Sequence, residues 1–215
     1  MGKLVTVTGI GHVSAIPDTV CVVLQLATVH AEYAQAIQGA KQKVTQLETV
    51  ITAQEFSVEE LKTQSFSIDT KEKSEFKEEV WQTESIGYEV NQTVTLQFPF
   101  HQERLEELLT SISKTEVQPV ISLQFTVSDR LTLQKQLLIN ATNDARLQAE
   151  ILAEASNLLL GDLVQIENST TEQRPFLSPM VFQSTVSRQA AMPTIQPAMI
   201  EETLSVTFCW KLKNK

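Results

Sequence analysis

Hydrophobic and polar residues alternate along several stretches of the chain, and this period of two predicts β-strands. The first two such runs lie within residues 3–31, and Pro17-Asp18 separates them as a turn or bulge signal. Another strand is predicted to begin near Asp162. The remaining alternating runs cover residues 60–69, 81–98, 120–129 and 202–212.

Two other stretches repeat their apolar residues every three or four positions, which predicts helices with one buried face. The first begins near Glu32, and its predicted buried stripe consists of Tyr33, Ile37, Ala40, Val44, Leu47 and Ile51. The second is shorter, and its stripe consists of Leu105, Leu108, Leu109 and Ile112.

A third helix is predicted from Asp129, a candidate N-cap, to about Leu159, with Gly161 as its stop signal. It carries a smooth strip of small residues along which a neighbouring backbone can approach closely: Ala141, Ala145 and Ala149. The order of elements is therefore β-β-α-β-β-α-β-α-β-β. This order indicates an α+β fold, with antiparallel sheets formed from β-hairpins and helices packed on one face.

The predicted domain covers residues 3–212, either as one domain or as two closely packed α+β halves. Residues 169–199 form a long loop rich in proline, serine, threonine and glutamine. We expect this loop to be too irregular to add a strand to the core, and loops of this length are often used for contacts. Its apolar side chains are candidate interface residues: Phe176, Met180, Phe182, Met192 and Met199.

A pair of glycines, Gly9 and Gly11, raises the question of a phosphate-binding loop. A dinucleotide fingerprint needs a third glycine, where this chain has Ser14, and a helix directly after the glycines. Here Pro17 and a second strand follow, so we predict that the chain binds no nucleotide. The glycines instead permit a strand bend, a bulge or the close approach of another backbone.

Catalytic and metal-binding patterns are absent from the sequence. His12, Ser14 and Asp18 lie within seven residues of an extended segment, which disfavours their convergence as a catalytic triad. The three histidines have no metal-ligand spacing. We therefore predict no catalytic residues, no metal and no cofactor. Cys21 and Cys209 are predicted to be free thiols, with Cys209 the more accessible.

Composition narrows the choice of partners. The 215 residues carry a formal net charge of −9, which repels phosphate backbones and argues against nucleic acid. No apolar run approaches the ~20 residues that span a bilayer, so no membrane insertion is expected. Residues 1–9 lack the apolar region of a secretion signal, which favours the cytoplasm; a trimmed envelope protein would look the same.

Five stretches occur in an order that resembles the SIMPL-domain family: VTVTGIGHVSAIPDT, GYEVNQTVTL, ISLQFTVSD, NATNDARLQAEILAEASN and LGDLVQI. The resemblance implies an α+β fold, and for some bacterial relatives it implies homo-oligomers and links to stress tolerance. It implies no catalytic residues. Asn157 stands where a glycine is common near the end of the long helix. The positions that match the family motif are interpreted as structural: Gly9, Gly11, Pro17, Asp18, Gly87, Tyr88, Asn91, Phe125, Ala145, Ala149 and Gly161.

Two classes of function follow from these observations. The favoured one is a non-enzymatic, self-assembling protein whose partner is another copy of the same chain. The alternative is an adaptor that binds another protein through an edge strand or through the proline-rich loop. An enzyme ranks third, because no catalytic arrangement is recognisable.

Overall fold

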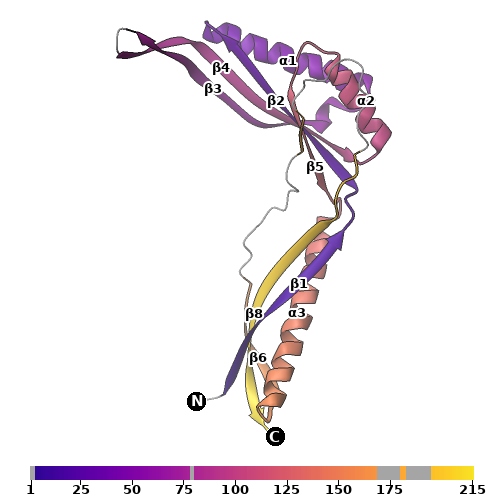
Figure 1. Cartoon of the computed structure of the whole chain (residues 1–215). Coiled ribbons are helices and arrows are strands. Elements are labelled where there is room, and N and C mark those ends of the chain that lie inside the picture. The colour runs from indigo at the N-terminus through magenta and orange to yellow at the C-terminus, as the bar shows by residue number, and fades with distance from the viewer. Residues whose placement is uncertain (1–2, 78–79, 169–179, 183–194) are drawn as a thin grey trace. The chain divides into compact units, whose positions relative to one another are not determined.

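The strands of the chain divide between two antiparallel sheets, as the computed structural model shows for residues 3–77, 80–168, 180–182 and 195–215 (Figure 1). Each sheet belongs to its own compact unit. Unit 1 consists of Met1–Pro17, Val127–Pro175 and Pro197–Lys215. Unit 2 consists of Asp18–Thr126 and Phe176–Gln196. The α+β class is confirmed, and so is the predicted order of elements apart from one additional short strand in the proline-rich segment.

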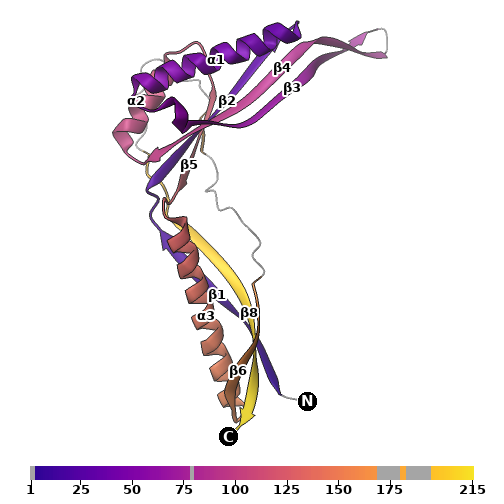
Figure 2. The same ribbon diagram turned by 180° about the vertical axis from the view of Figure 1, so that it is seen from behind.

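Unit 1 contains a three-stranded sheet and one long helix. Its elements are β1 (Leu4–Ala15), α3 (Arg130–Ala155), β6 (Leu158–Glu167) and β8 (Ile200–Asn214). The strand order is β1-β8-β6, and β8 pairs antiparallel with both neighbours. Strands from the two ends of the chain therefore pair with each other, and α3 runs along the sheet they form (Figure 2).

The core of unit 1 joins large side chains on the sheet to small ones on the helix. Val7, Val206, Phe208 and Trp210 pack against the fully buried Ala141, Ala145 and Ala149. The rings of Phe208 and Trp210 stack with their centroids 5.3 Å apart. The smooth alanine strip predicted from the sequence is thus the surface on which the sheet rests.

The Gly9-Gly11 pair allows this close packing. A Cβ atom on Gly9 would lie 2.0 Å from the carbonyl oxygen of Ala141, and one on Gly11 would lie 2.1 Å from that of Leu137. The pairing of β1 with β8 shows no register shift, so the strand contains no bulge at these glycines. Of the roles predicted for the glycines, the close approach of another backbone is the one that the structure confirms.

Unit 2 contains a five-stranded sheet with helices on one face. Its strand order is β3-β4-β2-β5-β7. The elements are β2 (Thr19–His30), α1 (Tyr33–Ala53), a 3-10 turn (Val58–Glu60), β3 (Leu61–Lys77), β4 (Val80–Pro99), α2 (Gln102–Ser113), β5 (Val120–Thr126) and β7 (Met180–Phe182).

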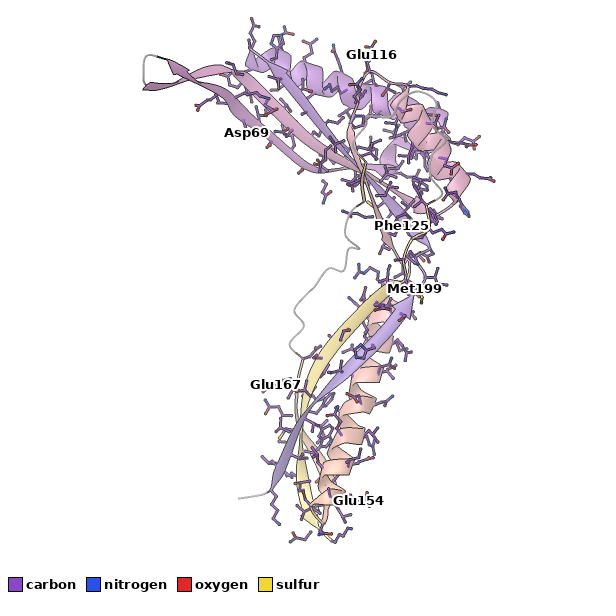
Figure 3. The ribbon with its side chains drawn as sticks, in the orientation of Figure 1. Asp69, Glu116, Phe125, Glu154, Glu167 and Met199 are labelled. Carbon is purple, nitrogen blue, oxygen red and sulfur yellow. The ribbon has the colours of Figure 1, made fainter. Side chains whose placement is uncertain are left out.

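The predicted inner face of β2 forms the centre of the unit 2 core. Val20, Val22, Leu24 and Leu26 are all buried, and they pack with the apolar stripe of α2 and with Leu47 and Ile51 of α1. Phe125 of β5 completes this core and meets the ring of Phe100 edge-on at 5.2 Å (Figure 3). The stripe of α2 is confirmed at all four predicted positions.

The predicted stripe of α1 is wrong at its N-terminal end. Tyr33 is half exposed, and Ala36 is buried in its place. The Tyr33 ring instead contacts the Tyr88 ring edge-on at 5.4 Å, which covers part of its apolar surface without burying its hydroxyl. A tyrosine side chain suits this half-covered position at the first turn of the helix, because its ring is apolar and its hydroxyl is polar.

Gly161 does not stop the long helix. The helix α3 ends at Ala155, and Asn157 adopts the left-handed conformation with φ 55°. Gly161 lies inside β6, where a Cβ atom would be 2.8 Å from the carbonyl oxygen of Lys211. The stop signal is therefore Asn157, because a short polar side chain tolerates positive φ better than most others.

Pro17-Asp18 marks the boundary between the two units. The strands on either side of it, β1 and β2, belong to different sheets and do not form a hairpin. Two backbone hydrogen bonds fix Asp18 at the start of unit 2. Its N–H donates to the Thr126 carbonyl oxygen at 3.2 Å, and its carbonyl oxygen accepts from the Phe100 N–H at 2.8 Å. The consecutive strands that do pair are β3 and β4, and Asn91 lies within that ladder.

The proline-rich segment contributes a strand, contrary to the prediction. Met180 and Phe182 are the end residues of β7, which pairs with β5 at the edge of the unit 2 sheet. Ile195 is buried in the core of unit 2. Three or more residues of extended backbone suffice for such a pairing, so proline content alone does not exclude it. Phe176 and Met192 lie outside the described residues, and Met199 is exposed.

Candidate functional site

The residues considered for catalysis do not form a catalytic arrangement in the described part of the chain. His12 Nδ1 lies 3.1 Å from Thr203 Oγ1, on the strand next to it. Asp18 accepts a hydrogen bond of 2.7 Å from the Thr19 hydroxyl. Among the described residues, no three His, Cys, Asp or Glu side chains are grouped so as to hold a metal ion. None of the described helices has the length and hydrophobicity to cross a bilayer.

A shallow groove of about 480 Å³ lies on the strands of unit 2. Glutamine side chains from three strands line it, together with serine, threonine and valine: Val23, Gln25, Gln64, Ser65, Thr93, Val120, Ser122 and Gln124. The lining contains no charged side chain. It therefore offers no cation to a phosphate group.

The two cysteines differ in their surroundings. Both are free and partly buried, Cys21 in β2 and Cys209 in β8. Burial raises the pKa of the Cys21 thiol, which lowers the fraction of reactive thiolate at neutral pH. We expect Cys209 to react first with a thiol reagent. Timed alkylation of the native protein followed by peptide mass spectrometry checks the order, and faster labelling of Cys21 would contradict it.

Exposed apolar side chains concentrate on unit 1. Of the 20 large apolar side chains exposed among the described residues, 14 belong to unit 1, although it is the smaller unit. Ten of them lie on two consecutive elements, α3 and β6, and we call these ten the apolar surface. They are Leu131, Leu138, Ile139, Leu147, Ile151, Leu152, Leu159, Leu163, Val164 and Ile166. In Figure 3, the labelled Glu154 and Glu167 help to locate the two elements: Glu154 lies near the end of α3, and Glu167 is the last residue of β6.

The helix α3 reverses the usual relation between size and burial. Four of its six buried residues are alanines, whereas Leu147, Ile151 and Leu152 are exposed. A helix that is apolar on several faces normally has neighbours on several faces. Here the sheet covers one face, and the described residues leave the larger apolar side chains uncovered.

Strand β6 adds an open edge to the apolar surface. It is the last strand of its sheet, so its outer edge has no strand partner among the described residues. Leu163 and Val164 are both exposed at a point where the pairing of β6 with β8 shifts register, so two consecutive apolar side chains stay uncovered there. An exposed edge with apolar side chains is a template for pairing with another strand.

The other edge of the same sheet is closed. On β1, the backbone N–H of Ile10 donates to Asp144 Oδ2 of α3 at 2.8 Å. Two residues further on, the carbonyl oxygen of His12 accepts from Asn140 Nδ2 of α3 at 2.9 Å. Side chains of the helix thus occupy two of the backbone groups that a further strand would need, in the middle of β1.

The bond to Ile10 makes stability depend on pH. The Ile10 N–H, the Gln148 side chain and, more weakly, the charge of His12 lower the pKa of Asp144. Because the folded pKa lies below the unfolded value, the stabilisation is present above about pH 4 and is lost as pH falls through the folded pKa. We expect Asp144→Asn to be less stable than wild type at pH 7, with a difference that narrows below pH 4. Urea unfolding at both pH values measures this, and a difference that does not change with pH would contradict it.

Charge also separates the two units. Unit 1 carries eight Lys and Arg against nine Asp and Glu, whereas unit 2 carries nine against seventeen. Nearly all of the net charge of −9 therefore belongs to unit 2. Because unit 1 is nearly neutral, electrostatic repulsion between the unit 1 parts of two copies is weak.

These features define a two-unit α+β protein with an apolar, nearly neutral unit and no recognisable catalytic centre in its described part. The chain belongs to the SIMPL family, described as a protein of unknown function (DUF541), whose model matches residues 5–210. The resemblance noted in the sequence is thus confirmed over nearly the whole chain. A comparison with characterised proteins gave no match.

Proposed function

We propose that this SIMPL protein is a non-enzymatic, self-assembling protein whose copies associate through unit 1. The observation that carries the proposal is the apolar surface on α3 and β6, where ten large side chains are exposed. Large apolar side chains that gather in the open on one part of a protein typically mark interaction sites.

The size of the apolar surface suits a protein interface. Fully burying one such side chain contributes about 1.5–3 kcal/mol at roughly 25 cal/mol per Å². Ten side chains that are about half exposed then offer several hundred Å², the order of the roughly 800 Å² that each partner contributes to a standard interface. The near-neutral charge of unit 1 favours a second copy, because unit 2 with its excess of acidic residues would repel its own kind.

Polar substitutions on the apolar surface test this proposal. We expect Leu147→Gln combined with Ile151→Gln to reduce the mass measured by light scattering, because both side chains are exposed on α3. The matched control changes two exposed apolar residues of unit 2, Val29→Thr and Phe66→Gln, and should leave the mass unchanged.

If both double variants keep the mass of the intact protein, the part of α3 that carries Leu147 and Ile151 is not the interface. If the intact protein is itself monomeric while it remains folded by circular dichroism, self-assembly is rejected. An adaptor that offers the open edge of β6 to a different protein then becomes the better function.

A further inference from the structure

We infer that two copies associate by antiparallel pairing of β6 with β6 of the second copy. The two three-stranded sheets would then join into one six-stranded sheet across a two-fold axis. This inference rests on the proposed self-assembly and specifies its geometry. It follows from the difference between the two edges of the unit 1 sheet.

The edge formed by β1 is closed to a further strand over residues 9–12. Asp144 and Asn140 of α3 bind the Ile10 N–H and the His12 carbonyl, at 2.8 Å and 2.9 Å. The helix backbone also lies so close at Gly9 and Gly11 that a Cβ atom would clash with it. A head-to-tail assembly, in which β6 of one copy pairs with this part of β1 of the next, would have to break these bonds.

The edge formed by β6 is open. None of the described strands pairs with its outer side, and none of the described α3 side chains forms a hydrogen bond with its backbone. Leu163, Val164 and Ile166 are exposed there, so the same strand from a second copy supplies apolar side chains of matching kind. Cross-strand apolar pairs stabilise antiparallel ladders.

The position of the axis follows from the charges and the register of β6. Its two acidic residues are Asp162 and Glu167, and no Lys or Arg lies on the strand. A register that places Asp162 opposite Glu167 of the other copy is disfavoured, because like charges directly across a ladder destabilise it. That register has its two-fold axis midway between Val164 and Gln165. We therefore place the axis at Val164, so that Asp162 lies opposite Ile166 of the other copy.

A lysine on the open edge tests the pairing directly. Val164→Lys would place two positive charges close to each other near the axis, and should raise the dissociation constant of the dimer at least about 100-fold. Ile10→Lys is the matched control, because Ile10 is 43% exposed on the closed edge and Val164 is 49% exposed on the open edge. It should leave the dissociation constant within about threefold of wild type, measured by sedimentation.

Single cysteines test the two-fold symmetry and disturb the fold less. In a Cys21→Ser, Cys209→Ser background, one cysteine is placed in turn at Leu163, Val164, Gln165 and Ile166. Residues facing each other in an antiparallel pair have Cα atoms about 4.5–5.5 Å apart, within the range of a disulfide. We expect one or two of these positions to form covalent dimers on mild oxidation, whereas Thr8→Cys on β1 should not.

The outcomes separate the two proposals. The pairing of β6 with β6 is supported if covalent dimers form at these positions and if Val164→Lys loses the dimer while Ile10→Lys keeps it. An oligomer that survives Val164→Lys and gives no cross-link at any of the four positions overturns the pairing but leaves self-assembly intact. An intact protein that is monomeric throughout overturns both.

Discussion

The Gly9→Ala variant is expected to lose about 3 kcal/mol or more of its free energy of unfolding. The added methyl group would lie 2.0 Å from the Ala141 carbonyl oxygen and 2.6 Å from the Ala145 side chain. Neither neighbour can move easily, because one is helix backbone and the other is fully buried against the sheet. Gly11→Ala should be similarly destabilised, since its Cβ atom meets the Leu137 carbonyl oxygen at 2.1 Å.

Gly39→Ala is the control for this prediction. Gly39 lies within α1, and its added methyl group would meet only the terminal methyl of the Thr28 side chain, at 2.9 Å. Alanine is favoured over glycine in a helix by about 1 kcal/mol, which offsets that contact. Chemical denaturation compares the three variants. If Gly9→Ala were as stable as Gly39→Ala, the close contact of β1 with α3 would be wrong.

Gly87→Ala is expected to lose about 2–4 kcal/mol of the free energy of unfolding. Gly87 has φ 137°, a conformation that other residues rarely adopt, and it lies next to a register shift between β3 and β4. A Cβ atom there would be 2.4 Å from the His30 carbonyl oxygen. Backbone strain at this φ and steric overlap with the His30 carbonyl oxygen therefore both destabilise the variant.

The neighbouring Ile86→Ala variant separates this effect from a general sensitivity of the strand. Ile86 is exposed, so its truncation should cost about 1 kcal/mol or less. Thermal and urea unfolding report both variants. Equal losses for the two would show that the glycine conformation is not the cause.

Hydrophobic periodicity predicted the elements of this fold well but not their partners. The alternation in β2 placed Val20, Val22, Leu24 and Leu26 correctly in a core. A period of two identifies the buried face of a strand but carries no information on which strand lies beside it. The pairing of β1 with β8, across nearly the whole sequence, and the division into two units at Pro17 therefore emerged only from the structure.

The sequence and the structure draw attention to different candidate interfaces. The sequence drew attention to apolar residues among prolines, whereas the exposed apolar side chains of the described residues concentrate on α3 and β6. A usable signal was present: alanines at 141, 145 and 149 form the smooth face that a sheet covers, which leaves Leu147 and Ile151 on other faces of the helix. Periodicity identifies the apolar faces of a helix but not the elements that pack against them. Which apolar face stays exposed can therefore be seen only in the tertiary structure.

Sedimentation velocity of the intact protein over a hundredfold range of concentration tests self-assembly most directly. One chain has a mass of 24.0 kDa. Self-assembly through unit 1 predicts a species whose mass is a whole multiple of that value, beginning with the dimer, and whose proportion rises with concentration. A single species of 24.0 kDa at every concentration would contradict it.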